Sequence, residues 1–418
     1  MEDWKEYKLG DIGTIVGGAT PSTKDSSNYD GNIAWITPKD LSNLNCRYIS
    51  HGERMISQKG FDDCSCRMLP KNSILFSSRA PIGYVAIAQN ALCTNQGFKS
   101  IIPNNEIVDS LFLYYLLVYY KPVIENMGSG TTFKEVSGSV MKALTVNIPN
   151  IDEQKRIAAI LSSLDDKIEL NRRINGNLEQ QAQALFKAWF VDFEPFKGGE
   201  FVESKLGRIP KELTISKIGD IPHKIESGKR PKGGATSEGI PSIGAENIKG
   251  LGFYDYSKTK YIPKDFASIT NRGKISGYEL LIYKDGGKPG YFIPNYTIFG
   301  EGFPFEYMFI NEHVFLLDLM SREYNIFAYF YMQTPYIMNQ LNSIGGKAAI
   351  PGINTKDVES LPIFTDDNKK VKEFGKIVLP MITTILKNSR ENAHLTKLRN
   401  TLLPRLMSGE LKINDLNR

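Results

Sequence analysis

Basic and small polar residues occur in glycine- and proline-rich loops in both halves of the 418-residue chain. Phosphate oxygens are bound by Lys and Arg, by Ser and Thr hydroxyls and by backbone N–H groups. The forked side chains of Arg79 and Arg230 could also bind guanine, and Asn247 could bind adenine. Any one of these residues could instead be an ordinary solvated surface residue. The candidates for contact with a polyanion are Thr20, Ser22, Lys24, Lys39, Ser77, Ser78, Arg79, Lys134, Lys229, Arg230, Lys232, Asn247, Lys249, Lys284, Lys288 and Lys347.

Residue patterns of known catalytic sites are absent from the sequence. There is no GxxxxGK[ST] phosphate loop, no GxGxxG after a predicted strand, no HExxH and no GxSxG. The Asn/Asp-Pro-Pro-Tyr tetrapeptide of amino-methyltransferases is missing too. The Glu-x-Lys triplets at residues 6–8 and 410–412 have no partner acid nearby in sequence that could complete a metal-binding nuclease site. We therefore expect no catalytic residues.

The four cysteines do not suggest a disulfide framework or a metal site. They all lie in the first quarter of the chain, and Cys64-Ser-Cys66 has the wrong spacing for a zinc knuckle. The four histidines are scattered, which also argues against acid–base catalysis centred on histidine. We expect the thiols to be structural or incidental.

Composition and charge give weaker information. The chain is 41% hydrophobic and 23% charged, as in ordinary globular proteins, and it is long enough for two or three domains. Its net charge is +5. Residues 222–290 contain 12 Lys/Arg against 7 Asp/Glu, so this one segment carries an excess as large as that of the whole chain. A basic segment favours a polyanionic partner.

Neither a secretion signal nor a membrane span is predicted. The first ten residues, MEDWKEYKLG, have no basic region followed by an apolar run. The most apolar stretch, Leu111 to Tyr120, has ten residues and is too short to cross a bilayer. We therefore expect a cytoplasmic protein.

A long helix is predicted over residues 150–190, and we expect it to position the domains that carry these loops. Its apolar positions alternate in steps of four and three, a 3.5-residue period typical of a coiled coil, with two asparagines in the middle. About forty helical residues would extend roughly 60 Å and would need a partner. The predicted seam consists of Ile157, Leu161, Leu164, Ile168, Asn171, Asn175, Leu178, Ala182 and Leu185.

The same seam recurs 217 residues later, and eight of its nine positions keep their character. The exception is Arg399, which stands where the first seam has Ala182. Shorter matches precede it: KIGDI repeats KLGDI, IPSIGAENI aligns with IAWITPKDL, and Asn311 corresponds to Asn95. The second seam is Phe374, Val378, Met381, Ile385, Asn388, Asn392, Leu395, Arg399 and Leu402.

These matches predict a tandem duplication of a mixed α/β (α+β) domain followed by a long helix. The expected parts are a first domain at 1–149, a long helix and linker at 150–198, a second domain at 199–364 and a second long helix at 365–418. The simplest closed arrangement is an intramolecular antiparallel coiled coil with pseudo-two-fold symmetry.

An antiparallel pair would bring Asn171 near Asn392 and Asn175 near Asn388. The alternative is that the asparagines face solvent and that Ile174 takes the core position. Two diverged domains held at a fixed separation suit a long regular ligand, of which duplex DNA is the obvious example.

At this point the whole chain resembles the specificity (S) subunits of type I restriction–modification systems. The resemblance rests on KLGDI, GGATPST, IAWITPKDL, NSILFSSRAPIGYVAI and CTNQGFKSI. It rests above all on the helical stretch IDEQKRIAAILSSLDDKIELNRRINGNLEQQAQALFKAWF, and TLLPRLMSGEL resembles the closing segment of the family.

The resemblance implies a subunit without its own active site, whose two target recognition domains each read one half of a split site in double-stranded DNA. It implies that the helices set the spacer and bind two modification (methyltransferase) subunits, and that restriction subunits join through these. S-adenosylmethionine, ATP and Mg would bind to the partner subunits only, with no cofactor or metal in this chain. Candidate partner-binding residues on the first helix are Gln181, Phe186, Trp189 and Phe190. These four could instead pack on the neighbouring recognition domain.

The sequence departs from the family pattern in two places. The second half lacks the TPS and ITPKDL sequences, so its DNA loops cannot be assigned residue by residue. In addition, Arg399 interrupts the apolar seam. Two other functions stay open: a stand-alone DNA-binding regulator of the same architecture, and a coiled-coil scaffold without a DNA role.

Overall fold

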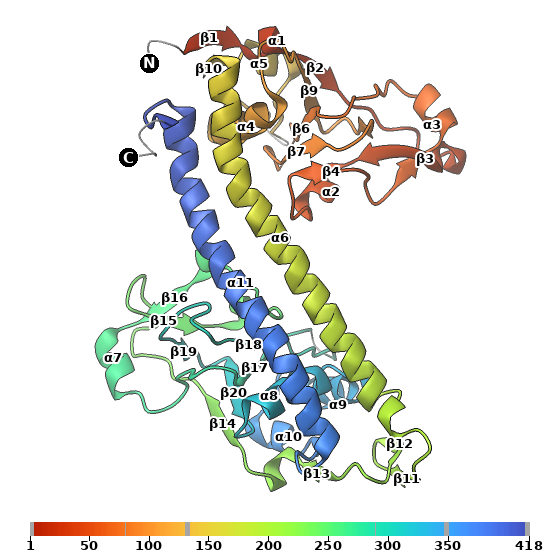
Figure 1. The fold of residues 1–418 in the computed structure, drawn as a ribbon, viewed down its shortest axis with the longest axis vertical. Helices are drawn as coiled ribbons and strands as arrows, with labels where there is room; N and C mark the ends of the chain where they lie inside the picture. Colours follow the sequence, from red (N-terminus) through yellow and green to blue (C-terminus); the bar gives the residue numbers. More distant parts are fainter. Residues whose placement is uncertain (1–3, 80, 130–133, 289, 347–350, 414–418) are drawn as a thin grey trace. The chain divides into compact units, whose positions relative to one another are not determined.

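The computed structural model describes residues 4–79, 81–129, 134–288, 290–346 and 351–413, and its chain forms two compact units (Figure 1). Unit 1 contains residues 1–169 and 394–418, and unit 2 contains residues 170–393. Each long helix is thus shared between the units, whereas the sequence suggested helical segments separate from the recognition domains. Lys347 lies outside the described residues.

Unit 1 is a mixed α/β domain, and its described residues form three sheets. A two-stranded sheet has the order β1-β10, a five-stranded sheet β2-β9-β6-β7-β4, and a three-stranded sheet β5-β3-β8. The strands are β1 (Lys5–Lys8), β2 (Gly13–Gly17), β3 (Tyr29–Ile36), β4 (Tyr48–Ile49), β5 (Met55–Ile56), β6 (Ile74–Phe76), β7 (Val85–Ala88), β8 (Cys93–Thr94), β9 (Lys99–Pro103) and β10 (Thr145–Ile148). The helices before the long one are α1 (Leu9–Ile12), η1 (Ser26–Asn28), α2 (Pro38–Ser42), α3 (Gln58–Asp62), α4 (Ser110–Asn126) and α5 (Gly138–Ala143).

Unit 2 contains the same three sheets and one extra hairpin. Its sheets have the orders β13-β21, β14-β20-β17-β18 and β16-β15-β19, and β11 pairs with β12. The strands are β11 (Phe201–Ser204), β12 (Gly207–Pro210), β13 (Ile215–Lys217), β14 (Lys224–Ser227), β15 (Ile240–Ile243), β16 (Lys260–Ile262), β17 (Leu280–Tyr283), β18 (Tyr296–Ile298), β19 (Phe309–Ile310), β20 (Val314–Asp318) and β21 (Pro362–Phe364). The short helices are η2 (Glu194–Phe196), η3 (Ile218–Asp220), η4 (Ala245–Asn247), η5 (Tyr256–Lys258), α7 (Lys264–Ile269), α8 (Arg322–Tyr331), α9 (Pro335–Gly345) and α10 (Thr355–Glu359).

Strand pairing confirms the duplication that the sequence predicted. In each unit the strand that opens the repeated part pairs antiparallel with the last strand before a long helix, β1 with β10 and, after the β11–β12 hairpin, β13 with β21. In each three-stranded sheet the central strand has one antiparallel and one parallel neighbour. Among the described residues of the second copy, no strand corresponds to β4.

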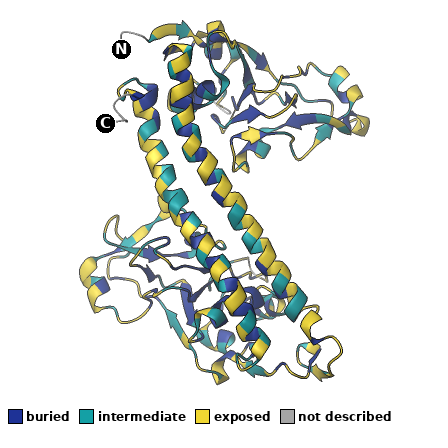
Figure 2. Ribbon diagram, in the orientation of Figure 1, coloured by how far each residue is buried: buried dark blue, intermediate teal, exposed yellow. Residues whose placement is uncertain are grey.

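Each unit has its own apolar core. In unit 1 the predicted apolar run forms α4, whose start is capped by Asp109. Phe112, Leu116 and Leu117 of this helix are fully buried against the sheets and against the first turns of α6. In unit 2, α8 is buried along nearly its whole length. Buried residues therefore fill the sheets and the inner helix faces, and exposed residues line the outer faces (Figure 2).

The long helices are α6 (Ile151–Phe190) and α11 (Lys369–Met407), and segments of the two pair antiparallel within each unit. None of the predicted seam positions is exposed. Ile157, Leu161 and Ile168 are buried in α6, and Phe374, Val378 and Ile385 are buried in α11. Partly buried positions of the seam are Leu164, Asn175, Leu178, Leu185, Met381, Asn388, Asn392, Leu395 and Leu402.

The two asparagine pairs form the expected polar layer. Asn171 is fully buried, and its Nδ2 donates to Oδ1 of Asn392 at 3.0 Å and to Oε2 of Glu391 at 2.7 Å. Nδ2 of Asn388 donates to Oδ1 of Asn175 at 2.9 Å. Because Asn171 corresponds to Asn388 and Asn175 to Asn392 at the offset of 217, the layer obeys a local two-fold relation. Ile174 is only partly buried and does not replace the asparagines.

Arg47 fastens the unit 1 sheets to α6. Its side chain is almost fully buried and binds Oε1 of Glu169 through Nε at 3.0 Å, and its Nη2 donates to Asp166. Burial favours the neutral form of the guanidinium, but the bonds to Glu169 and Asp166 outweigh it, so the pKa of Arg47 lies above its usual value. The orientation of the sheets on the helix is thus set by charge-assisted hydrogen bonds as well as by apolar packing.

Candidate nucleic-acid interface

Four loops of unit 1 that are far apart in sequence meet at one edge of the domain. The glycine loop after β2 is held by Ala19 N, which donates to Thr94 O at 3.0 Å, and by Trp35 Nε1, which donates to Ala19 O at 3.0 Å. Gly18 lies so close to this turn that an added Cβ would be 2.1 Å from the carbonyl oxygen of Asn95. The motif GGATPST therefore has glycine at this position because two backbones touch.

The turn after β8 connects the other loops to this edge. Asn95 N donates to Ile36 O at 2.9 Å, and Gly97 N donates to Oδ1 of Asn95 at 2.9 Å. Ser78 N then donates to Gly97 O at 2.7 Å. These bonds bring segments 20–23, 36–39, 77–79 and 94–97 together, although they are spread over about eighty residues.

Unit 2 builds the same edge from different residues. Asn311 N donates to Ile243 O at 2.9 Å, and His313 N donates to Oδ1 of Asn311 at 2.9 Å. Lys284 N donates to His313 O at 3.1 Å, and Gly228 N donates to Asn311 O at 3.2 Å. The backbone framework is therefore repeated, while the side chains that it presents have changed.

Many of the predicted DNA contacts are exposed at these edges. Ser22, Lys24, Lys39, Arg79 and Lys134 are exposed in unit 1, and Thr20 is half-buried. In unit 2 the exposed ones are Lys229, Arg230, Lys232, Lys249 and Lys288, and Lys284 is half-buried. Lys229 and Arg230 also line a hollow of about 150 Å³ together with Lys260 and His313.

Three predicted contacts need correction. Ser77 and Ser78 are fully buried, and their hydroxyls donate to the carbonyl oxygens of Pro81 and Gly97. Asn247 is also fully buried, and its Oδ1 accepts a bond from Gly244 N at 3.2 Å. Their side chains stabilise loops and cannot reach a ligand outside, so Asn247 does not contact adenine in this conformation.

Acidic side chains neutralise part of the positive charge. Nε of Arg79 lies 2.9 Å from Oε2 of Glu135, and Nζ of Lys39 lies 2.7 Å from Oε2 of Glu53. Glu135 is partly buried, which raises its pKa, but its bonds to Arg79 and Lys99 outweigh this, and the pKa of the carboxyl is lowered. Arg79 is thus held in place and keeps 45% of its side chain exposed.

Sequence reasoning missed several polar residues at these edges. Gln96, Asp285, Glu312 and His313 lie within or beside the duplicated turns, and Nδ1 of His313 is 2.8 Å from Oδ2 of Asp285. The signal that could have found them was the correspondence of Asn95 with Asn311. Gln96 and Glu312 directly follow these two asparagines, and His313 comes one residue later.

The partner-binding candidates at the end of α6 divide into two groups. Gln181 is exposed, and Trp189 is half-buried beneath the ammonium of Lys370, which lies 5.0 Å from its ring centroid. Phe186 and Phe190 are buried in the core of unit 2, where both rings pack against Phe327. The prediction that these two phenylalanines form a partner surface is therefore corrected, since the recognition domain already covers them.

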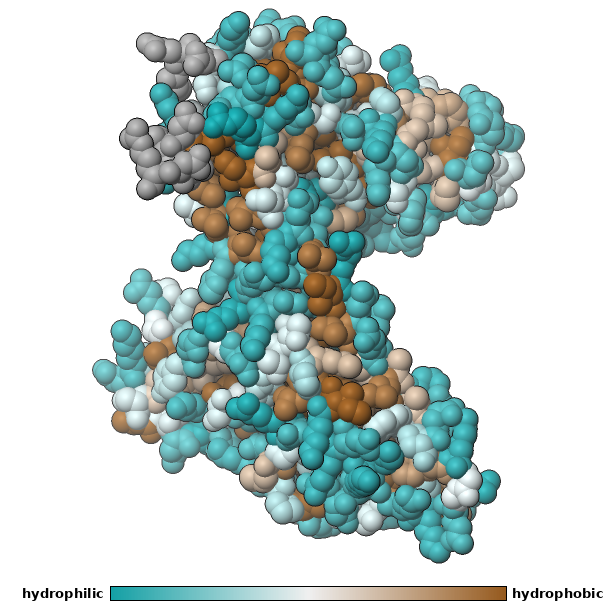
Figure 3. Space-filling model, in the orientation of Figure 1, coloured by the Kyte–Doolittle hydropathy of each residue, from teal (hydrophilic) through white to brown (hydrophobic). Residues whose placement is uncertain are grey.

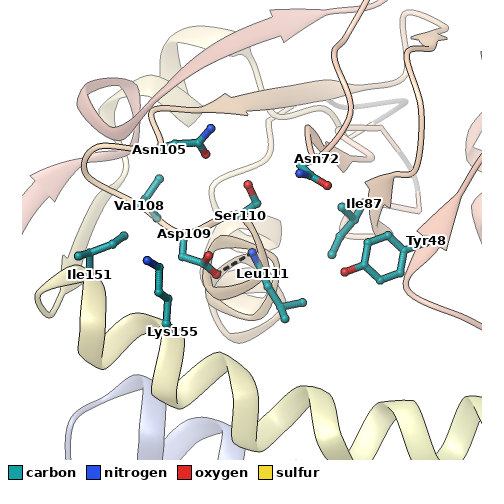
Figure 4. Close-up of a pocket in the computed structure, with 10 residues that line it drawn as sticks. All are labelled: Tyr48, Asn72, Ile87, Asn105, Val108, Asp109, Ser110, Leu111, Ile151 and Lys155. Atoms are coloured by element: carbon teal, nitrogen blue, oxygen red, sulfur yellow. Dashed lines mark hydrogen bonds between the residues drawn. The ribbon is translucent and has the colours of Figure 1, made fainter.

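A hollow in unit 1 does not involve the predicted contacts. It has a volume of about 390 Å³ and is lined by Asn72, Asn105 and Lys155 among others (Figure 4). The carboxylate of Asp109 at its centre accepts bonds from Leu111 N and Phe112 N at 3.0 and 2.9 Å. The Asp109 carboxylate therefore serves as the N-cap of α4.

Metal-binding clusters and membrane-spanning helices are also absent from the residues that the structure describes. In that part of the chain, no group of three or more His, Cys, Asp and Glu side chains is arranged to hold a metal ion. None of the helices described there combines the length and the apolar character that crossing a membrane requires.

Comparison with known proteins identifies the family. Residues 1–180 match the model of the type I restriction modification DNA specificity domain. The chain is 35% identical to the type I restriction enzyme MjaIX specificity subunit of Methanocaldococcus jannaschii, over 99% of this chain and 95% of the relative. It is 27% identical to the HindI specificity subunit of Haemophilus influenzae, over 98% and 100% of the two chains. The protein therefore belongs to the specificity subunits of type I restriction–modification systems, which confirms the resemblance seen in the sequence.

A solved structure shows the same fold. The crystal structure of the type I restriction–modification S subunit from M. genitalium superposes with a TM-score of 0.58 at 18% identity, and the match covers 96% of each chain. The tandem arrangement of mixed α/β domains and long helices is thus a fold of this family.

Proposed function

We propose that the protein is the non-catalytic DNA-recognition subunit of a type I restriction–modification complex, and that each unit reads one half of a bipartite site in double-stranded DNA. The observation that carries the proposal is the duplicated loop edge, in which one backbone framework presents different exposed polar residues. Two related readers with different side chains suit two different half-sites.

The long helices are proposed to set the spacer between the half-sites and to bind two modification subunits. Coiled-coil pairing uses one face of each helix and leaves the other face to solvent. Apolar residues on these outer faces, Leu170, Ile377 and Leu398, are 39–46% exposed and suit a protein partner better than the buried phenylalanines do. Hydrophilic side chains cover most of the face drawn in Figure 3, with smaller apolar patches among them.

Catalysis and cofactors are assigned to the partner subunits. S-adenosylmethionine would bind to the modification subunits, and ATP and Mg to the restriction subunits that join through them. No residue of this chain is proposed to take part in methyl transfer or DNA cleavage.

The loop after β14 provides a direct test. Lys229, Arg230 and Lys232 are exposed, so replacing all three with glutamine should weaken duplex binding without disturbing the core. Each lost phosphate contact should reduce the slope of log K against log salt concentration by about 0.9. Gel shifts on duplex DNA at several salt concentrations measure both effects.

A matched control neutralises three exposed lysines outside the edge, Lys197, Lys205 and Lys211, near the β11–β12 hairpin. The control should keep most of the affinity. Equal losses in both triple variants would show that the contact loop is placed incorrectly. Absence of any duplex binding would instead favour a coiled-coil scaffold.

Copurification separates the proposed subunit from a stand-alone regulator. A specificity subunit should retain a methyltransferase subunit when it is purified from cells that express both proteins. Methylome sequencing of those cells would then report the two half-sites and their spacer. A chain that binds one DNA sequence but no methyltransferase would support the regulator.

A further inference from the structure

One pair of side chains occupies the same place at the edge of both units. In unit 1 the hydroxyl of Thr20 donates to Oε1 of Gln96. In unit 2 the guanidinium of Arg230 lies 3.7 Å from Oε1 of Glu312. Thr20 follows Gly18 by two residues, just as Arg230 follows Gly228, and each acceptor follows the turn asparagine directly.

The backbone beneath both pairs is held rigidly. Each turn asparagine binds the end of the central strand, to Ile36 O in unit 1 and to Ile243 O in unit 2, at 2.9 Å in both. Each accepts a second bond of 2.9 Å from the N–H two residues on. A Cβ at Gly228 would approach Ile310 O to 2.0 Å, much as one at Gly18 would approach Asn95 O. The turn tips are therefore presented on preorganised backbone, as base-reading side chains require.

The chemistry at the tips differs between the units. Gln96 is exposed and carries an amide, which both donates and accepts hydrogen bonds. Glu312 keeps 33% of its side chain exposed, and an ionised carboxylate only accepts. Arg230 is 69% exposed, and its contact with Glu312 is long, so this ion pair is loose enough for either group to turn to a ligand.

We infer that Gln96 and Glu312 determine base specificity, one in each half-site, and that Thr20 and Arg230 are the residues that position them. The inference rests on the proposed DNA-reading function. An amide pairs with N6 and N7 of adenine, whereas a carboxylate accepts from N4 of cytosine and is repelled by edges that offer only acceptors. Gln96 thus predicts an adenine contact in the half-site of unit 1, and Glu312 predicts a cytosine contact in the half-site of unit 2.

Reciprocal substitutions test the inference on the full chain assembled with its modification subunits. Selection from a random duplex pool is carried out with wild type, Q96E and E312Q. Each variant should change the preferred base at one position of one half-site, with a change in discrimination of about tenfold or more, and leave the other half-site unaltered. The control Glu203→Gln, on an exposed strand of the β11–β12 hairpin, should select the wild-type site.

Substitutions of Thr20 test its positioning role. Thr20→Val removes the hydroxyl at nearly constant shape and should relax the base preference at the position read by Gln96. Thr20→Ser restores the hydroxyl and should restore the preference, whereas a purely structural methyl contact would show the opposite order. E312D serves as a second variant for unit 2, because it keeps the charge but withdraws the acceptor by one methylene group.

The outcomes distinguish failure of the proposed DNA-reading function from failure of the inference about Gln96 and Glu312. If the wild-type complex selects no sequence, the proposed function fails. If it selects a bipartite site that Q96E and E312Q also select with unchanged preference, the DNA-reading function stands and the inference is overturned. A uniform loss of affinity for all sequences would also overturn it, since that result identifies a phosphate or structural role.

Discussion

Arg399 and Asp165 form a largely buried ion pair between α11 and α6 in unit 1. Nη1 of Arg399 lies 2.6 Å from Oδ1 of Asp165, and the hydroxyl of Tyr115 donates to the other carboxylate oxygen at 2.7 Å. Asp165 is only 4% exposed. The arginine that interrupts the apolar seam therefore has a partner. At the offset of 217 the corresponding residues of unit 2 are Ala182 and Ile382, both fully buried.

The two units suggest a substitution experiment on this pair. R399A should lower the free energy of unfolding by about 3 kcal/mol, the low end of the range for a broken buried pair because Arg399 is partly exposed, since a buried carboxylate loses its counter-charge. The double variant D165I/R399A installs the residues of unit 2 and should cost less than the single variant, since no charge is left unpaired. Urea unfolding of wild type, both single variants and the double variant gives the coupling energy. Additive losses would contradict the pairing.

At the scale of elements, the asparagine layer explains how the register between α6 and α11 is set. An apolar 3.5-residue seam can slide by a heptad at little cost, whereas buried amides must meet partners. Asn171 pairs with Asn392 and Asn175 with Asn388, so both pairs form in one register. Asn175 Nδ2 also donates to Ser389 Oγ at 3.2 Å, which ties the layer to a further position of α11.

Replacing one asparagine should be worse than replacing two. N175L leaves Asn388 without its partner and should lower the free energy of unfolding by about 1–3 kcal/mol. N175L/N388L removes both amides and should recover most of that loss, at the expense of register specificity. Thermal or urea unfolding checks the order of the three proteins. A double variant less stable than the single one would argue against the amide pair.

At the scale of the whole molecule, both long helices pass from one unit to the other. The units divide between Glu169 and Leu170 in α6 and between Ala393 and His394 in α11. These two points are opposite each other in the pairing, because Asn171 meets Asn392. The division therefore offers a place to lengthen both helices without touching the contacts inside either unit.

Inserting seven residues at both points tests whether the helices set the spacer. A heptad preserves the phase of the seam and adds about 10.5 Å of helix. At 3.4 Å per base pair, the spacer of the methylated site should grow by about three base pairs while both half-sites stay the same. Methylome sequencing reads the result. Insertion in one helix only should disrupt the pairing, and an unchanged spacer in the double insertion would refute the role of the helices.

Periodicity in the sequence was enough to predict the helices, their antiparallel pairing and the duplication. A seam such as Ile157 to Leu185 depends on spacing along one helix, and the asparagines mark a register that only one alignment satisfies. The strand orders of the two units confirmed the repeat down to its parallel pair. The glycine-rich loops could also be located from the sequence, because glycine and proline favour turns through local backbone preferences.

Only the tertiary structure decided which loop residues face outward. Ser77, Ser78 and Asn247 are residue types that often contact ligands, but here they are buried and hydrogen-bond to backbone groups. The partner of Ser78, Gly97, is remote in sequence, whereas Pro81 and Gly244 lie close to Ser77 and Asn247. Phe186 and Phe190 lie on a helix face that α8 covers. Conversely, the matching backbone bonds of the two turns place Gln96 and Glu312 at equivalent positions. Side-chain exposure depends on contacts between segments remote in sequence, and no local pattern records them.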